Sequence, residues 1–193
     1  MNKQSNIDYD ALVKEDRVHG RVYTDPRIYE EELDNIFHRG WVYVGHASEV
    51  PNSGDFRLRR IGQQTVIMVR DDDGQVQLFM NRCPHRANAV CQVERGNTKA
   101  FRCAYHGWSF ATNGELKGLP YQDRYSSSFR KEDHGLRQVP RMGTYRSFVF
   151  GSLSPVGISL DDHLGPRVKE QIDLCVDLSP VGELDVTAGV HKY

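Results

Sequence analysis

Four side chains with metal-binding chemistry lie in two short segments. Cys83 and His85 stand one residue apart, Cys103 and His106 stand two residues apart, and 17 residues separate His85 from Cys103. Thiolate sulfur and imidazole nitrogen are ligands that zinc and iron centres use. Spacings this short suit two loops that close on one inorganic centre. We therefore predict a metal site with Cys83, His85, Cys103 and His106 as ligands.

The order of these ligands separates two kinds of centre. Zinc fingers pair Cys with Cys and His with His, whereas a Rieske centre needs two thiolates on one iron and two imidazoles on the other. Two loops that each supply one Cys and one His meet the second demand. Zinc held by the same four side chains, in a non-redox interaction module, stays open as an alternative because zinc takes sulfur and nitrogen ligands tetrahedrally.

The residues around the ligands resemble a known family. Cys83-Pro84-His85-Arg86 and Cys103-Ala104-Tyr105-His106-Gly107-Trp108 are similar to the Rieske box of the large (alpha) subunit of aromatic-ring-hydroxylating dioxygenases. Similar segments outside the box are Trp41–His46, Gly54–Phe56 and Gly118–Pro120. The resemblance covers about residues 15–193 and corresponds to the amino-terminal half of such subunits.

The resemblance implies a mainly β fold, in which antiparallel sheets hold the cluster loops at one end and short helices lie near both termini. It implies a [2Fe-2S] cluster of Rieske type on Cys83, His85, Cys103 and His106. In the family, this half relays single electrons to a mononuclear non-haem iron in a carboxy-terminal catalytic domain. The implied partners are a reductase or ferredoxin as donor and the catalytic domain of an adjacent subunit, in a trimeric oligomer active in aromatic hydrocarbon catabolism.

Three further residues are expected to surround the cluster. Trp108 is expected to shield it from water, and Tyr105 belongs to the second loop. Arg86 either donates a hydrogen bond near the cluster or holds its loop. The resemblance also implies that His106 presents a free N–H at the surface.

Two departures from related sequences bear on the site. Respiratory Rieske proteins carry disulfide cysteines where this chain has Asn88 and Tyr105, which implies fewer stabilising contacts and a potential near the low end of the Rieske range, about −150 mV. Ala87 and Ser147 stand where glycine is usual in the family. Glycine favours positive φ, so an unusual loop backbone is expected at both positions.

Composition sets broad limits on function. The chain has 193 residues, a formal charge of −1 and 38% hydrophobic residues, which predicts a globular protein with no nucleic-acid partner. Its apolar runs, such as Val66–Val69, are far shorter than the roughly 18 residues of a membrane span. We expect a cytoplasmic protein in which Cys91 and Cys175 are free, buried thiols.

No oxygen-activating iron site is expected in this chain, because its remaining histidines are scattered. The cluster Asp161-Asp162-His163 is assigned to the start of a helix, where acidic side chains complement the helix dipole. The absence of a G-x-G sequence argues against a nucleotide fingerprint, so electrons are expected from another protein. A stand-alone Rieske electron carrier is the remaining alternative.

The predicted organisation has three parts. Residues 1–40 form an arm and a helix, residues 41–155 form the Rieske domain, and residues 156–193 form a connecting helix and the first strand of a missing catalytic domain. The helices are expected after Pro26 and over residues 160–176, disturbed at Gly165-Pro166. The strands are expected over residues 41–46, 56–61, 65–70, 75–81, 98–102, 108–110, 115–117, 136–139, 145–153 and 184–190. The Asp71–Asp73 turn and the Arg57, Arg59 and Arg60 group are expected to be solvated.

Overall fold

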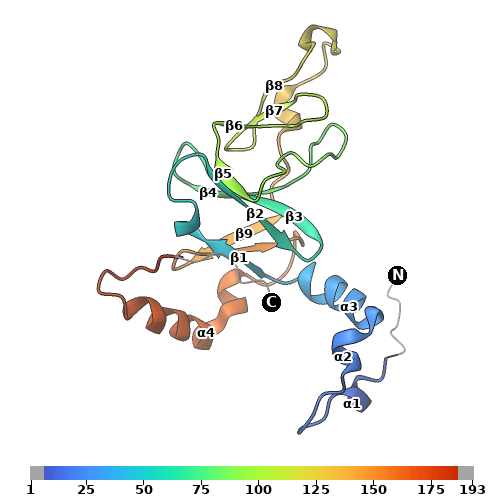
Figure 1. Cartoon of the computed structure of the whole chain (residues 1–193), viewed down its shortest axis with the longest axis vertical. Helices are drawn as coiled ribbons and strands as arrows, with labels where there is room; N and C mark the ends of the chain where they lie inside the picture. The colour runs from blue at the N-terminus through green and yellow to red at the C-terminus, as the bar shows by residue number, and fades with distance from the viewer. Residues whose placement is uncertain (1–6, 187–193) are drawn as a thin grey trace.

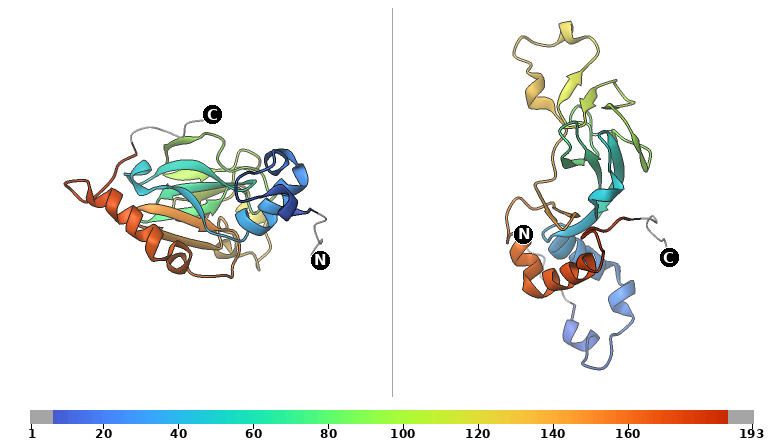
Figure 2. Two further views of the ribbon diagram at one scale, coloured as in Figure 1. Left: turned by 90° about the horizontal axis from the view of Figure 1, so that it is seen from below. Right: turned by 90° about the vertical axis from the view of Figure 1, so that its left-hand side faces the viewer.

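The computed structural model describes residues 7–186 and contains three antiparallel sheets. The β6–β8 sheet lies at the top of Figure 1, and helices α1–α4 lie at the opposite end. The right-hand view of Figure 2 shows the same elongated arrangement from the side, and the left-hand view looks along the long axis from below. This mainly β architecture with a few short helices confirms the predicted fold class.

The largest sheet has the strand order β4-β3-β2-β5. Its strands are β2 (Asp55–Ile61), β3 (Gln64–Arg70), β4 (Val76–Met80) and β5 (Arg95–Asn97). In β3 the run from Val66 to Val69 is fully buried on both faces of the sheet. Because side chains alternate along a strand, Ile67 and Val69 enter one hydrophobic core while Val66 and Met68 enter another. Strand β3 therefore separates the two cores.

The second sheet has the order β1-β10-β9, with β1 at Val42–His46, β9 at Arg141–Tyr145 and β10 at Phe148–Ser152. Arg146 and Ser147 connect β9 to β10, and both have positive φ, 46° and 68°. Positive φ at both central residues is the feature of a type I′ hairpin turn. Ser147, which stands where the family usually has glycine, therefore has a strained backbone, as expected.

The third sheet, β6-β7-β8, packs on the core that contains Ile67 and Val69. Its strands are β6 (Ala100–Arg102), β7 (Ser109–Ala111) and β8 (Leu116–Gly118). The excursion that follows carries only the short 3-10 helices η3 (Gln122–Arg124) and η4 (Lys131–His134). A further 3-10 helix, η2 (Ala47–Glu49), follows β1.

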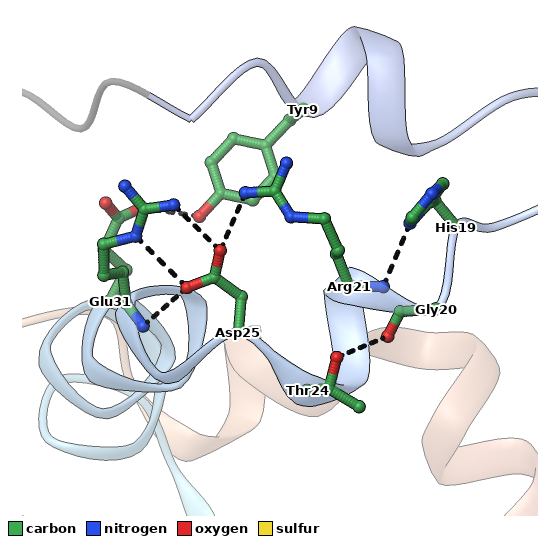
Figure 3. Close-up of polar contacts among 8 residues, drawn as sticks. Tyr9, His19, Gly20, Arg21, Thr24, Asp25 and Glu31 are labelled. Carbon is green, nitrogen blue, oxygen red and sulfur yellow. Dashed lines mark hydrogen bonds and ion pairs between the residues drawn. The ribbon is translucent and has the colours of Figure 1, made fainter.

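Four short helical segments form the amino-terminal arm. They are α1 (Tyr9–Leu12), α2 (Arg21–Thr24), α3 (Pro26–Glu32) and the π-helical η1 (Leu33–Phe37). Asp25 caps α3 by accepting a hydrogen bond from the backbone N–H of Arg27, and its carboxylate also pairs with the Arg21 and Arg27 guanidinium groups (Figure 3). The Tyr9 hydroxyl donates to Glu31 at 2.6 Å, which ties α1 to α3.

The carboxy-terminal helix α4 (Leu160–Asp177) is capped by Ser159 and kinked at Gly165, where φ is 61°. Asp161 and Asp162 occupy its first turn, as predicted. Tyr145 donates to Asp173 at 2.7 Å, and Arg146 pairs with the same carboxylate, so α4 is bound to the β9–β10 hairpin. Among residues 7–186, no helix combines the length and apolar character needed to cross a bilayer.

Several local predictions were wrong. Strand β9 was missed, and residues 136–139 contribute only a single bridge from Gln138 to Phe79. Asp71 is not solvated: it is 3% exposed and accepts hydrogen bonds from the backbone N–H groups of Asp73 and Gln75, which fixes the turn.

Two surface assignments also need correction. Arg57 and Arg59 are half-buried and pair with Glu49, so they do not form a free basic face. Cys175 is exposed because the buried stripe of α4 passes through Leu164 and Val176 instead. The predicted strand over residues 184–190 lies partly outside the described residues, and its described part, 184–186, has no regular structure.

Candidate metal centre

The first candidate loop lies between β4 and β5 and begins at Cys83. The backbone N–H of Cys83 donates to the carbonyl of Asn88 at 2.8 Å, and the Cys83 carbonyl accepts from the N–H of Ala87 at 2.8 Å. Ala87 has a φ of 57°, so it adopts the left-handed backbone that was expected where the family usually has glycine. The loop is therefore a closed turn with the cysteine at its base.

The second loop, between β6 and β7, repeats this turn. The N–H of Cys103 donates to the carbonyl of Trp108 at 2.8 Å, and the Cys103 carbonyl accepts from the N–H of Gly107 at 2.9 Å. Gly107 has a φ of +72° and occupies the place of Ala87. The two loops thus share one backbone design at separate places in the sequence.

Two backbone N–H groups donate toward each cysteine sulfur. The N–H groups of the second and third residues after the cysteine point to its sulfur, namely His85 and Arg86 for Cys83 and Tyr105 and His106 for Cys103. The two thiols also hydrogen-bond to each other, and each residue is 2% exposed. Converging N–H groups of this kind stabilise a thiolate.

The two thiols differ in acidity. Burial raises the pKa of Cys83 above the ordinary value, more than its backbone donors lower it. Burial also acts to raise the pKa of Cys103, but the N–H groups of Tyr105 and His106, together with the Cys83 thiol and Asn88, bring that pKa below the ordinary value. Asn88 contributes to this effect because its side-chain Nδ2 lies 3.8 Å from the Cys103 sulfur.

The two histidines lie together on the other side of the loops. The rings of His85 and His106 have centroids 4.6 Å apart and are inclined at 75°. Burial, and then the charges of His106 and Arg86, lower the pKa of His85. Its Nδ1 atom is buried and has no hydrogen-bond partner among the described residues. A neutral imidazole with an unpaired nitrogen has the protonation state and the lone pair that a metal requires.

Aromatic side chains surround the histidine pair. Trp108 stacks on His85 at 5.0 Å and is itself 2% exposed, while Tyr125 and Phe129 from the excursion pack edge-on against the indole. Tyr105 covers His106, with ring centroids 3.8 Å apart, and is 57% exposed. Both histidines remain half-buried, because these contacts cover only part of each imidazole.

Arg86 is exposed and lines a cavity of about 540 Å³ beside the first loop. Arg82 and Arg137 also line this cavity, whereas no acidic side chain among residues 7–186 does. The guanidinium of Arg86 adds positive charge beside His85, and the two roles expected for Arg86, a hydrogen bond near the cluster or support of its loop, stay predictions.

The donor arrangement bears on the kind of metal centre. The four predicted ligands form one sulfur pair and one imidazole pair. A single tetrahedral zinc ion requires four donors around one point. A [2Fe-2S] cluster of Rieske type requires two thiolates and two imidazoles on separate irons, and this donor set fits it.

Comparison with known proteins decides the family. The family model described as "Rieske [2Fe-2S] domain" matches residues 40–143. The chain belongs to the Rieske [2Fe-2S] domain family. The donor set of this Rieske domain agrees with the cofactor in the family's description.

The curated relatives of this Rieske domain are longer oxygenase subunits. It is 35% identical to the biphenyl 2,3-dioxygenase subunit alpha of Rhodococcus jostii (strain RHA1), over 99% of this chain and 41% of the relative. It is 39% identical to the N,N-dimethyl phenylurea N-demethylase subunit alpha of Sphingobium sp. (strain YBL2), over 83% of this chain and 35% of the relative. The chain therefore spans about two fifths of the length of such subunits.

A solved structure shows the same relationship. Naphthalene 1,2-dioxygenase from Rhodococcus sp. bound to indole matches this chain with a TM-score of 0.82 and 36% identity, over 90% of this chain and 39% of that one. The predicted resemblance to ring-hydroxylating dioxygenase alpha subunits is confirmed, as is its restriction to the Rieske half.

Two asparagines near the loops were not predicted to act in the site. Asn81 accepts hydrogen bonds from the N–H groups of Val90 and Cys91 and donates to the Cys91 carbonyl, so it clamps the end of the first loop. Asn88 reaches across to the second loop. A polar side chain in a loop is common in any sequence, so only the folded arrangement reveals these two contacts.

Proposed function

We propose that this chain transfers one electron at a time through a [2Fe-2S] cluster, with Cys83 and Cys103 on one iron and His85 and His106 on the other. The observation that carries the proposal is the repeated turn, which places each cysteine beneath two backbone donors and brings the thiols together and the imidazoles together. The buried, unpaired Nδ1 of His85 supports the same ligand set.

When bound, the cluster supplies a one-electron redox couple whose reduced form carries one more negative charge. The protein provides the environment of that charge. The N–H groups of His85, Arg86, Tyr105 and His106 point toward the two sulfurs. Trp108 covers one face of the His85 ring, while the partial exposure of His106 provides a short route for the electron to a partner.

We propose further that this chain is the electron-relay half of an aromatic-ring-hydroxylating oxygenase alpha subunit. In that subunit the mononuclear iron belongs to the catalytic half, and a reductase or ferredoxin supplies the electrons. The acceptor is the catalytic domain of an adjacent subunit in a trimer. The free thiols of Cys91 and Cys175 suit a reducing cytoplasm. The three domain boundaries expected from the sequence, 1–40, 41–155 and 156–193, are part of this proposal.

Metal and sulfide analysis tests the proposal directly. The chain purified without air should contain about two iron atoms and two labile sulfides per chain and show the visible absorption of an iron–sulfur protein. Cys83→Ser, His85→Ala, Cys103→Ser and His106→Ala should each abolish that absorption. The matched controls Cys91→Ser, Cys175→Ser and His163→Ala should retain it, because these side chains lie outside the predicted ligand set.

The alternatives give different results in the same experiment. A colourless protein with stoichiometric zinc would identify the zinc-stapled interaction module. A red-brown protein whose gene encodes no catalytic half would identify a stand-alone Rieske carrier. A protein that retains its iron in all four ligand variants would overturn the ligand assignment.

A further inference from the structure

The two loops share one backbone design but differ in their side-chain donors. Cys83 and Cys103 each receive two backbone N–H groups at the same positions in their loops. Asn88 in the first loop corresponds to Trp108 in the second, because each residue's carbonyl accepts the N–H of its own loop's cysteine at 2.8 Å. Of these two side chains, only that of Asn88 extends to the cysteine sulfur of the other loop.

The amide group of Asn88 is held in a donating orientation. Its Nδ2 atom lies 3.0 Å from the Ala89 carbonyl oxygen and 3.8 Å from the Cys103 sulfur. Both neighbours are acceptors, so rotating the amide by 180° would place its oxygen against another acceptor. A sulfur atom is larger than oxygen, so hydrogen bonds to sulfur are longer. The nitrogen's two hydrogens can serve the two acceptors together.

We propose that Asn88 sets the reduction potential of the site by donating a hydrogen bond from the first loop to the thiolate of Cys103 in the second. This inference rests on the proposed function. Asn88 is a positioning residue that acts through Cys103 and does not itself bind the metal.

The sign of the effect follows from charge. Adding one electron makes the cluster one unit more negative without forming or breaking a covalent bond. A donor to a ligand sulfur stabilises the more negative state more, and therefore raises the midpoint potential. Removing the donor should shift the midpoint to more negative values.

Two substitutions with side chains of nearly equal size separate the effect of the hydrogen-bond donor from the effect of the side-chain volume. Asn88→Leu removes both polar atoms, and Asn88→Asp replaces the donor by a negatively charged acceptor. We expect Asn88→Leu to weaken the binding of the electron roughly threefold to tenfold, which is about 28–59 mV for a one-electron couple. Asn88→Asp should shift the midpoint further in the same direction, because a carboxylate beside the thiolate adds repulsion.

The measurement is spectroelectrochemical titration of the cluster-containing protein, with iron and labile sulfide determined for each sample. The matched control is Asn113→Leu, which lies at the opposite end of β7 from the second loop and whose side chain hydrogen-bonds to Glu115. Its midpoint should equal that of the wild type. Equal midpoints for wild type, Asn88→Leu and Asn88→Asp would overturn the inference.

A second readout needs no substitution. In the reduced wild type, asparagine labelled with 15N only in its side-chain amide should give a hyperfine coupling in pulsed electron paramagnetic resonance, because Asn88 places that nitrogen beside a cluster ligand. Absence of this coupling would contradict the contact even if the variants failed to fold. A wild-type chain without iron and labile sulfide would instead contradict the proposed function, so the two failures are distinguishable.

Discussion

The imidazole of His85 lies flat against the indole of Trp108, with ring centroids 5.0 Å apart and planes inclined by 8°. The ring of His106 meets the same imidazole nearly edge-on, at 75°. A ring held between an indole face and a second imidazole has little freedom to rotate. Trp108 thus fixes the direction of the His85 nitrogens as well as covering them.

Replacing Trp108 by alanine should remove both effects. Truncation of a buried aromatic side chain is expected to cost about 3–5 kcal/mol of stability, and water would reach the ring face of His85 that Trp108 covers. We expect a lower midpoint of thermal unfolding and faster loss of visible absorption in air, with Trp108→Phe intermediate.

The other tryptophan provides the control. Trp41 donates to the Ile158 carbonyl at 3.0 Å and stacks with Arg141, outside the ring cluster around His85. Trp41→Ala should leave the lifetime of the visible absorption unchanged. If Trp108→Ala keeps the wild-type lifetime as well, the shielding role is wrong.

The wild-type reduction potential should lie near the low end of the Rieske range, at about −150 mV. Within residues 7–186, the donors to the two sulfurs are backbone N–H groups, the thiols themselves and Asn88, and no hydroxyl donates to either sulfur. Few donors leave the more negative, reduced state less stabilised. Spectroelectrochemistry checks this value, and a midpoint above about +100 mV would contradict it.

Ala87→Gly should stabilise the protein. Ala87 has a φ of 57°, and the left-handed conformation costs a residue with a Cβ atom about 1–2 kcal/mol relative to its preferred backbone. Glycine adopts this conformation without that cost, so a gain of roughly 1 kcal/mol, or about 2–4 °C in Tm, is expected for a domain of this size.

Ala89→Gly serves as the comparison because Ala89 does not have positive φ. Its substitution should instead destabilise the protein by roughly 0.5–1 kcal/mol, through the greater chain entropy of glycine. Thermal unfolding of both variants at equal iron content measures the difference. A decrease in Tm for Ala87→Gly would refute strain at this turn.

The hydroxyl of Tyr9 should ionise only in strongly alkaline solution. The hydrogen bond to Glu31, followed by burial and the charge of the same carboxylate, raises the pKa of Tyr9 to about 12 (Figure 3). A group whose pKa is raised by folding stabilises the fold below its unfolded pKa of about 10, and that contribution is lost as pH rises through the folded value. The arm should therefore loosen between about pH 10 and pH 12.

Ultraviolet difference titration against Tyr9→Phe isolates this single phenol. Glu31→Ala removes the hydrogen-bond acceptor and should return the Tyr9 pKa toward 10. A Tyr9 phenol that already titrates near 10 in the wild type would show that α1 is not bound to α3 through this contact.

Local patterns predicted those elements that depend on near neighbours. Short, strand-length apolar segments located β2, β3 and β4, and Pro26 marked the start of α3, where the structure adds the Asp25 cap. Ala87 and Ser147 stand where the family usually has glycine, and both have the positive φ values that this difference predicted. Strand β9 escaped notice because Arg141, Gly143 and Thr144 give it no alternating apolar pattern, and its pairing with β10 alone defines it.

Burial could not be predicted where hydrogen bonds, ion pairs and the orientation of a helix in the folded chain decide it. Asp71 has the composition of a solvated turn, yet three donors within its own hairpin, including Gln77, enclose its carboxylate. Arg59 alternates along a strand like a surface residue, but Glu49, ten residues away, neutralises it. Cys175 follows the helical pattern, but the buried stripe of α4 passes through Leu164 and Val176 and leaves Cys175 exposed.

The sequence by itself determined the chemistry, because two Cys and His pairs in short loops restrict the possible centres to very few, and their flanking residues are specific. Only the tertiary structure decided how those pairs combine. The repeated turn brings sulfur to sulfur and imidazole to imidazole, and places Asn88 of one loop beside the cysteine of the other. Contacts between loops depend on backbone direction across the sheets, which the order of residues along the chain does not specify.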